Sequence, residues 1–177
     1  MSDNSNKSMS HQVILLAIPI IFSNLSRVIM GLTDMAMVSR LGINALAATG
    51  MGSLLLWLIM SMGIGVRTSV QTISSRRLGQ KKYQQCGNAL HNGIIMAVCI
   101  AIPFTIIGTF YSEEIAVLFL EDSIVIALCT EYLFIGYFGL IFVLISFAFQ
   151  GFYAGVEETK VHLVVTISSN ILNIYLN

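Results

Sequence analysis

Long apolar runs alternate with short polar segments along almost the whole chain. Each run is close to the roughly 20 residues that a helix needs to cross the hydrocarbon core of a bilayer. The runs cover residues 13–38, 46–73, 93–111, 124–153 and 161–177. In lipid, a single segment satisfies its backbone hydrogen bonds only as a helix, and these runs are too long and too uniformly apolar for barrel strands. The pattern predicts an all-α integral membrane protein with about five transmembrane helices, the fifth incomplete, after a polar tail over 1–12.

The charges of the connecting segments predict an orientation. The tail, the connection between the second and third spans and the connection between the fourth and fifth must share one side. These segments carry Lys7, Arg76, Arg77, Lys81, Lys82 and Lys160. The other side carries Arg40 together with Glu113, Glu114, Glu121 and Asp122. Because basic residues are retained on the cytoplasmic side, we predict a multi-pass protein of the cell membrane with a cytoplasmic N-terminus.

The amino-acid composition excludes further classes of protein. Hydrophobic residues make up 56% of the chain and charged residues 10%, with a mean hydropathy of +0.83. A soluble domain carries about 25% charged residues. The formal net charge is zero, so the chain has no basic field that would attract nucleic acid. No hydrolase, metalloprotease or phosphate-loop motif occurs in the sequence, and we expect neither enzymatic activity nor an organic cofactor.

One acidic residue lies within the first apolar run. Asp34 follows Val13 by 21 residues, about 30 Å along a helix, and the apolar residues 35–38 come after it. An ionisable residue inside a membrane segment indicates a functional site. Two interpretations stay open. Asp34 either caps the outer end of its helix, or it faces a cavity in which its carboxylate holds a proton or a sodium ion.

Amide side chains line one face of the fifth run. Asn170, Asn173 and Asn177 stand at positions i, i+3 and i+7 of the expected helix. The first and fifth spans run in the same direction, so Asn173 and Asn177 reach a depth similar to that of Asp34. Two interpretations fit this pattern equally well. The asparagines either contribute to a cation or proton site, or they form a stripe of hydrogen bonds that only holds helices together.

Two further polar positions and one proline complete the set of candidates. Asn24 and Arg27 interrupt the first run, and with Asn170 they are candidates for lining a cavity. Pro19 removes a backbone hydrogen bond from the first helix. We interpret it as a hinge or, as an alternative, a static kink.

Several stretches, taken in order, resemble the multidrug and toxic compound extrusion (MATE) transporters. The first helix matches at Leu16-Ala17-Ile18-Pro19, at Gly31-Leu32-Thr33-Asp34-Met35-Ala36-Met37-Val38 and at Arg40-Leu41-Gly42. Later matches are Ala45-Leu46-Ala47-Ala48, Leu78-Gly79-Gln80-Lys81-Lys82 and the asparagine-bearing segment from Asn170 to Asn177. Gly155-Val156-Glu157-Glu158-Thr159-Lys160 is similar to the family's Gly-x-Gly-Asp-Thr-Lys/Arg turn, with Glu157 and Glu158 in place of Gly and Asp.

The resemblance implies a fold and an activity. MATE proteins have twelve transmembrane helices in two lobes and export cationic or amphipathic compounds in exchange for sodium ions or protons. This chain would be an N-terminal portion of such a transporter, and the C-terminal lobe or another copy would be its partner. Asp34, Asn173 and Asn177 match the coupling site, Pro19 matches a bending position, and some members carry Asp where Asn177 stands. Metal binding beyond a sodium ion at Asp34 is not implied.

Two other functions stay open. A flippase for a lipid-linked sugar belongs to the same superfamily and would need a cationic groove, for which Arg27 and Arg67 are placed. The chain can also be a non-transporting membrane fragment of a disrupted gene, because it stops within its fifth apolar run. We expect contact with the lipid bilayer in every case.

Overall fold

A computed structural model describes residues 2–176, except for the side chains of residues 2–13, 15, 16, 19, 159, 162, 173, 174 and 176. The described part of the chain forms six helices. They are α1 (Ser2–Ser39), α2 (Ile43–Gly79), α3 (Tyr83–Phe110), α4 (Ser112–Val117), α5 (Ser123–Gly155) and α6 (Thr159–Leu176).

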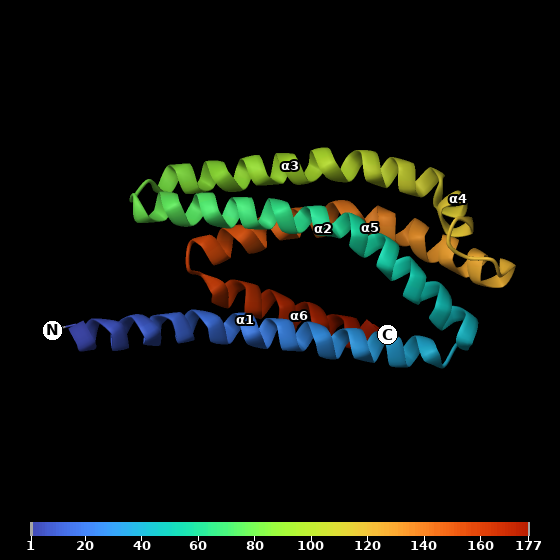
Figure 1. Ribbon diagram of the computed structural model, residues 1–177, viewed down its shortest axis with the longest axis horizontal. Coiled ribbons are helices and arrows are strands. Elements are labelled where there is room, and N and C mark those ends of the chain that lie inside the picture. Colours follow the sequence, from blue (N-terminus) through green and yellow to red (C-terminus); the bar gives the residue numbers. More distant parts are fainter. Residues whose placement is uncertain (1, 177) are drawn as a thin grey trace.

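The long helices form two groups that lie along one direction (Figure 1). Helices α2, α3 and α5 pack on one another, and the most extensive contact joins α2 to α5. Helices α1 and α6 lie side by side as the second group, although α6 follows α5 in the chain. The two groups are connected by the turn between α1 and α2 at one end and by the turn between α5 and α6 at the other.

Helix α5 contributes more buried residues to the core than any other described helix. Its buried residues recur every three or four positions, which places them on one face of a helix. They are Val125, Cys129, Leu133, Tyr137, Leu140, Leu144, Ala148, Gly151 and Gly155. The side chains of Leu133, Leu140 and Leu144 are fully buried. Many large apolar side chains elsewhere are exposed, as expected for helices that face lipid rather than water.

Two glycines bring α5 against α2. A Cβ atom at Gly151 would meet the backbone carbonyl oxygen of Arg67, and one at Gly155 would lie 2.7 Å from the carbonyl oxygen of Gln71. Small residues four positions apart allow helix backbones to approach closely in membranes. Gly151 and Gly155 are therefore packing residues and do more than mark the end of a helix.

In the described part of the chain, residues with positive φ occur in three turns, at Gly42, Lys81 and Glu157. Gly42 has φ of 108° at the start of α2, where glycine meets no steric penalty. Glu157 has φ of 66° between α5 and α6, where a side chain is unfavourable. Glu157 occupies the position of the second glycine in the Gly-x-Gly-Asp-Thr-Lys/Arg turn that this segment resembles. The left-handed backbone conformation explains why glycine is favoured there.

The helix bounds differ from the apolar runs. Helix α1 begins at Ser2, so the expected tail over 1–12 lies in a helix from Ser2 onward; its cytoplasmic location stays a prediction. Helix α3 begins at Tyr83, ten residues before the apolar run that starts at 93. Its N-terminal part carries the polar residues Gln85, Asn88 and Asn92, so the apolar pattern begins later than the helix. Helix α4 was not predicted, because six residues are too few for a periodic apolar pattern to appear.

By length and composition, α2, α3 and α5 can each cross a membrane. Helix α6 contains a shorter apolar stretch, Leu163–Leu172. Helix α1 is continuous, but Asn24, Arg27 and Asp34 interrupt its apolar sequence. The spans over 13–38 and 161–177 are helical over their described residues, and their passage through the membrane stays a prediction.

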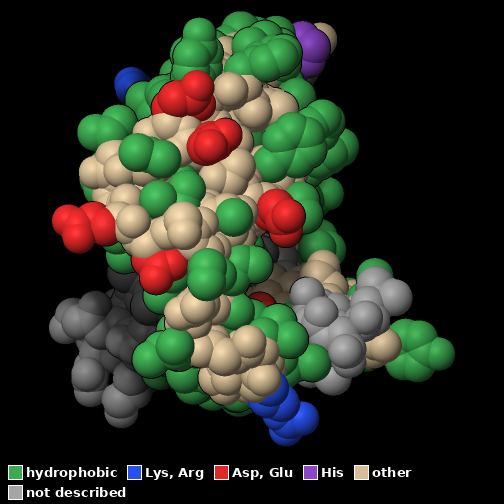
Figure 2. All heavy atoms as spheres, turned by 90° about the vertical axis from the view of Figure 1, so that its right-hand side faces the viewer, with side chains coloured by type: hydrophobic (Ala, Val, Ile, Leu, Met, Phe, Trp, Pro, Cys, Tyr) green, Lys and Arg blue, Asp and Glu red, His purple; other side chains and the backbone are tan. Residues whose placement is uncertain are grey.

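Charge is divided between the two ends of the molecule. The end that carries α4 displays several exposed acidic side chains scattered among apolar ones (Figure 2). Glu113 and Glu114 lie in α4, and Glu121 and Asp122 follow it; all four are exposed. The opposite end holds the α2–α3 and α5–α6 turns with Arg76, Arg77, Lys81, Lys82 and Lys160. The structure thus places these basic connections together at one end, as the sequence predicted.

Candidate functional site

Asp34 lines a cavity between α1, α2 and α5, here called the Asp34 cavity. Its volume is about 490 Å³, and Thr49 and Ser53 of α2 and Tyr132 of α5 also line it. Asp34 itself is half-buried. Of the two interpretations from sequence, the carboxylate that faces a cavity agrees with this placement.

The carboxylate of Asp34 is incompletely hydrogen-bonded. Its Oδ1 atom is buried and has no hydrogen-bond partner among the described residues. Nearby hydroxyl groups donate to backbone carbonyls of their own helices and not to Asp34. Thr33 donates to the Ile29 carbonyl at 3.0 Å and Thr49 to the Ala45 carbonyl at 2.9 Å. An ionised carboxylate only accepts, and the backbone N–H groups of its helix are already used. A proton or a bound cation satisfies such an oxygen.

A second cavity, here called the Arg27 cavity, lies between α1, α5 and α6. Its volume is about 520 Å³, and it is lined by Arg27, Gln150 and Asn170 among others. The Oε1 atom of Gln150 is buried and lacks a hydrogen-bond partner among the described residues. Phe149 and Tyr153 add aromatic surface. The cavity combines one cation, two amides and aromatic rings, which is a lining that can contact an amphipathic molecule.

A hydrogen bond fixes how α6 lies along α1. The Asn170 amide nitrogen donates to the Ser26 hydroxyl oxygen at 2.6 Å. The two helices run in the same direction (Figure 1), and Asp34 follows Ser26 by eight residues, about 12 Å along α1. Helix α6 continues six residues past Asn170 to Leu176, about 9 Å, toward the level of Asp34.

The predicted site residues are therefore only partly brought together. Arg27 and Asn170 share the Arg27 cavity, whereas Asp34 lines a different one, and the functional role of all three stays a prediction. Asn24 is exposed on α1 and lines neither cavity, so its cavity-lining assignment is not supported there. The Asn173 side chain and Asn177 lie outside the described part of the chain, as does the Pro19 side chain. Helix α1 continues through Pro19.

Several cavity residues were not predicted, and Gln150 and Tyr132 show what signal the sequence offered. Gln150 was visible as the one amide in an apolar stretch of α5, and its polarity at that depth was a usable signal. Tyr132 had no such signal, because tyrosine is ordinary in a membrane helix and only the packing of α5 against α2 brings it to Asp34. Across the described residues, no group of three His, Cys, Asp or Glu side chains is arranged to hold a metal ion.

The fold and its cavities define an all-helical membrane protein in which a half-buried carboxylate lines a cavity. The family model MatE matches residues 19–177. The chain belongs to the MatE family.

Curated relatives carry related names. A probable multidrug resistance protein NorM from Photorhabdus laumondii is 25% identical over 177 residues, which is all of this chain and 39% of the relative. A NorM from Rhodopseudomonas palustris is 29% identical over 67% of this chain and 25% of its own length. The probable multidrug resistance protein YoeA of Bacillus subtilis is 24% identical over 97% of this chain and 37% of its own length. The chain thus spans well under half the length of these relatives.

Solved structures share the fold. One is described as the outward-facing conformation of a multidrug resistance MATE family transporter of the MOP superfamily, with a TM-score of 0.88 at 19% identity. It matches over 93% of this chain and 37% of that chain. A MOP superfamily transporter from Pyrococcus furiosus gives a TM-score of 0.87 at 19% identity, over 93% of this chain and 36% of that one. The described helices therefore have the arrangement of part of such a transporter.

Proposed function

We propose that this chain provides the N-terminal part of a secondary multidrug exporter, in which Asp34 couples drug export to the entry of protons or sodium ions. The observation that carries the proposal is the buried Oδ1 atom of Asp34, which has no hydrogen-bond partner among the described residues. Membership of the MatE family and relatives named as multidrug resistance proteins support the same activity.

The mechanism follows from the charge of Asp34. With a proton or sodium ion bound, the carboxylate is neutralised and its burial costs less free energy. After the ion leaves, a conformer that hydrates the carboxylate becomes more stable. An ion gradient can then drive alternation between two conformers, provided that the two conformers bind the ion with different affinities.

The substrates in this proposal are cationic or amphipathic small molecules. The Arg27 cavity offers Phe149 and Tyr153 for apolar or aromatic groups and Gln150 for hydrogen bonds. Arg27 disfavours a cation at its own position, so a cationic head would lie toward Asp34, seven residues further along the same face of α1. The protein would act in the cell membrane with its N-terminus in the cytoplasm.

The test uses a chimera in which this chain replaces the aligned part of the Photorhabdus laumondii relative. Cells without their own exporters are loaded with a fluorescent cationic dye, and the rate of efflux is measured. We expect efflux from the chimera and loss of efflux in Asp34→Asn, because a neutral amide neither exchanges a proton nor balances a sodium charge. Membrane levels of the two proteins should be equal.

The matched control is Glu114→Gln, which removes one carboxylate from the exposed face of α4 and should leave efflux unchanged. Wild-type efflux in Asp34→Asn, or no efflux from the chimera itself, would contradict the proposal. The 177-residue chain expressed alone should give no efflux, because alternating access needs two lobes around a central site.

A further inference from the structure

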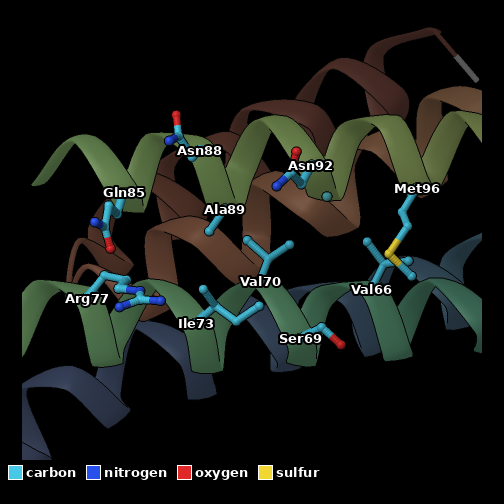
Figure 3. A pocket seen from close by; sticks show the side chains of 11 residues that line it. Val66, Ser69, Val70, Ile73, Arg77, Gln85, Asn88, Ala89, Asn92 and Met96 are labelled. Carbon is cyan, nitrogen blue, oxygen red and sulfur yellow. The ribbon is translucent and has the colours of Figure 1, made fainter. Parts of the chain in front are cut away.

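A groove on the surface of the molecule lies between α2 and α3, next to the turn that connects them (Figure 3). Its volume is about 450 Å³. Its floor is formed where Val70 of α2 contacts Gly93 of α3, at a position where a Cβ atom would collide with Val70. This groove is separate from the Asp34 and Arg27 cavities and shares no lining residue with them.

The polarity of the groove changes along its length. Arg77 and Gln85 face each other at the end near the turn, and Val66 and Met96 face each other at the other end (Figure 3). Val66 lies eleven residues from Arg77, about 17 Å along α2. Asn92 lies between the two ends, exposed on α3. Among the described residues that line it, the groove thus has its one cation at the turn end and Val66 and Met96 at the opposite end, with polar and apolar residues between them.

The turn end of the groove is positively charged. Arg77 donates one hydrogen bond to Gln80 Oε1 at 3.1 Å, and its other N–H groups are available to a ligand. Arg76, Lys81 and Lys82 belong to the same turn, and none of the described residues that line the groove is acidic. Basic pockets between membrane helices at a basic turn favour anionic lipid headgroups.

We propose that this groove binds one anionic phospholipid from the leaflet at the α2–α3 turn. The Arg77 guanidinium binds the phosphate, since its fork of donors matches phosphate oxygens. The amides of Gln85 and Asn92 donate to the headgroup and to an ester carbonyl below it. One acyl chain covers the exposed Met96 side chain at the other end of the groove, beside the buried Val66.

The observations favour a lipid over the two other occupants of similar chemistry. Free phosphate would use Arg77 but leave the apolar end of the groove without a partner. A protein helix would cover the apolar end but would leave the Asn92 amide facing apolar side chains at a cost in free energy. A phospholipid satisfies both ends, because its own polarity changes over a similar distance.

Native mass spectrometry on the purified, delipidated 177-residue chain tests the proposal. The chain is titrated with phosphatidylglycerol or with phosphatidylcholine of the same acyl chains. We expect one tightly bound phosphatidylglycerol and at least fivefold weaker phosphatidylcholine binding. Arg77→Ala should weaken phosphatidylglycerol binding about tenfold, as expected for loss of a charge-assisted contact. Arg77→Lys should be intermediate, and helix content by circular dichroism verifies that each variant is folded.

The matched control is Arg76→Ala, which removes the same charge from an exposed residue outside the groove and should change binding less than twofold. Equal losses in Arg76→Ala and Arg77→Ala would overturn the proposal, because they would indicate a diffuse basic surface. Equal binding of both lipids would overturn it as well. Displacement of the lipid by millimolar inorganic phosphate would assign the site to a soluble anion instead.

A photoreactive residue at Met96 examines the apolar end in membranes, since the Met96 side chain is exposed there. Cross-links to lipid acyl chains, reduced in Arg77→Ala, support the proposal. Cross-links to protein in place of lipid would overturn it.

Discussion

The side-chain amide of Asn170 donates a 2.6 Å hydrogen bond to the hydroxyl oxygen of Ser26, and the two residues are 144 positions apart. Asn170 also lines the Arg27 cavity, so one amide both joins α6 to α1 and contributes polar surface. Sequence reasoning left open whether the asparagine face of α6 holds helices together or binds a ligand. At Asn170 the structure shows the hydrogen bond between helices and a place in the lining of a cavity, and ligand binding there stays a prediction.

Removal of this contact should loosen the α1–α6 pair. We expect Asn170→Ala to lower the free energy of unfolding by about 1 kcal/mol, the scale of hydrogen bonds between membrane helices. A double-mutant cycle with Ser26→Ala, measured by unfolding in a detergent mixture, should give a coupling energy of similar size. Ser168→Ala, an exposed substitution on the same helix, serves as the control. A coupling energy near zero would show that the bond does not stabilise the pair.

The packing of α5 against α2 makes a second prediction. Gly151→Ala should lower the midpoint of thermal unfolding, because the added methyl group would collide with the Arg67 carbonyl and force the backbones apart. Overpacking of this kind costs about 1–3 kcal/mol. Gly139→Ala on the same helix has open space at its Cβ and should leave the midpoint unchanged or raise it slightly. Equal midpoints for the two variants would contradict the close approach.

The α5–α6 turn predicts a stabilising substitution. Glu157 holds a left-handed backbone conformation, and Glu157→Gly should raise the free energy of unfolding by about 1 kcal/mol by removing the steric conflict of its Cβ atom. Glu158→Gly lies outside that conformation and should give no gain. The comparison is made by thermal unfolding of both purified variants. A decrease in stability for Glu157→Gly would mean that its side chain makes a compensating contact.

The charge asymmetry predicts the orientation in the cell. In a background without the native cysteines, Glu114→Cys should react with a membrane-impermeant thiol reagent added to intact cells, and Lys81→Cys should react only after the cells are opened. Both positions are exposed, so access across the membrane is the variable measured. Reaction of Lys81→Cys but not Glu114→Cys in intact cells would reverse the orientation.

Much of the architecture followed from the sequence, because apolar runs are long and basic residues are few. The order of the long helices, the parallel direction of α1 and α6, and the division of charge between the ends were all predicted. The cavities could not be predicted in the same way. Asp34 was found by its charge, but Tyr132 beside it depends on which face of α5 packs against α2, and one sequence does not specify that contact. Helix α4 is too short to have a periodic signal.

The pairing of α1 with α6 also sets an order for assembly during synthesis. Ser26 emerges 144 residues before Asn170, which at about 5–20 residues per second is an interval of roughly 7–30 s. During that interval α2, α3 and α5 can already pack together, because their contacts do not involve α6. Helix α1, with Arg27 and Asp34, must meanwhile stay beside lipid or the insertion machinery without its principal partner. Completion of α6 is therefore the step that gives α1 its most extensive contact with another helix.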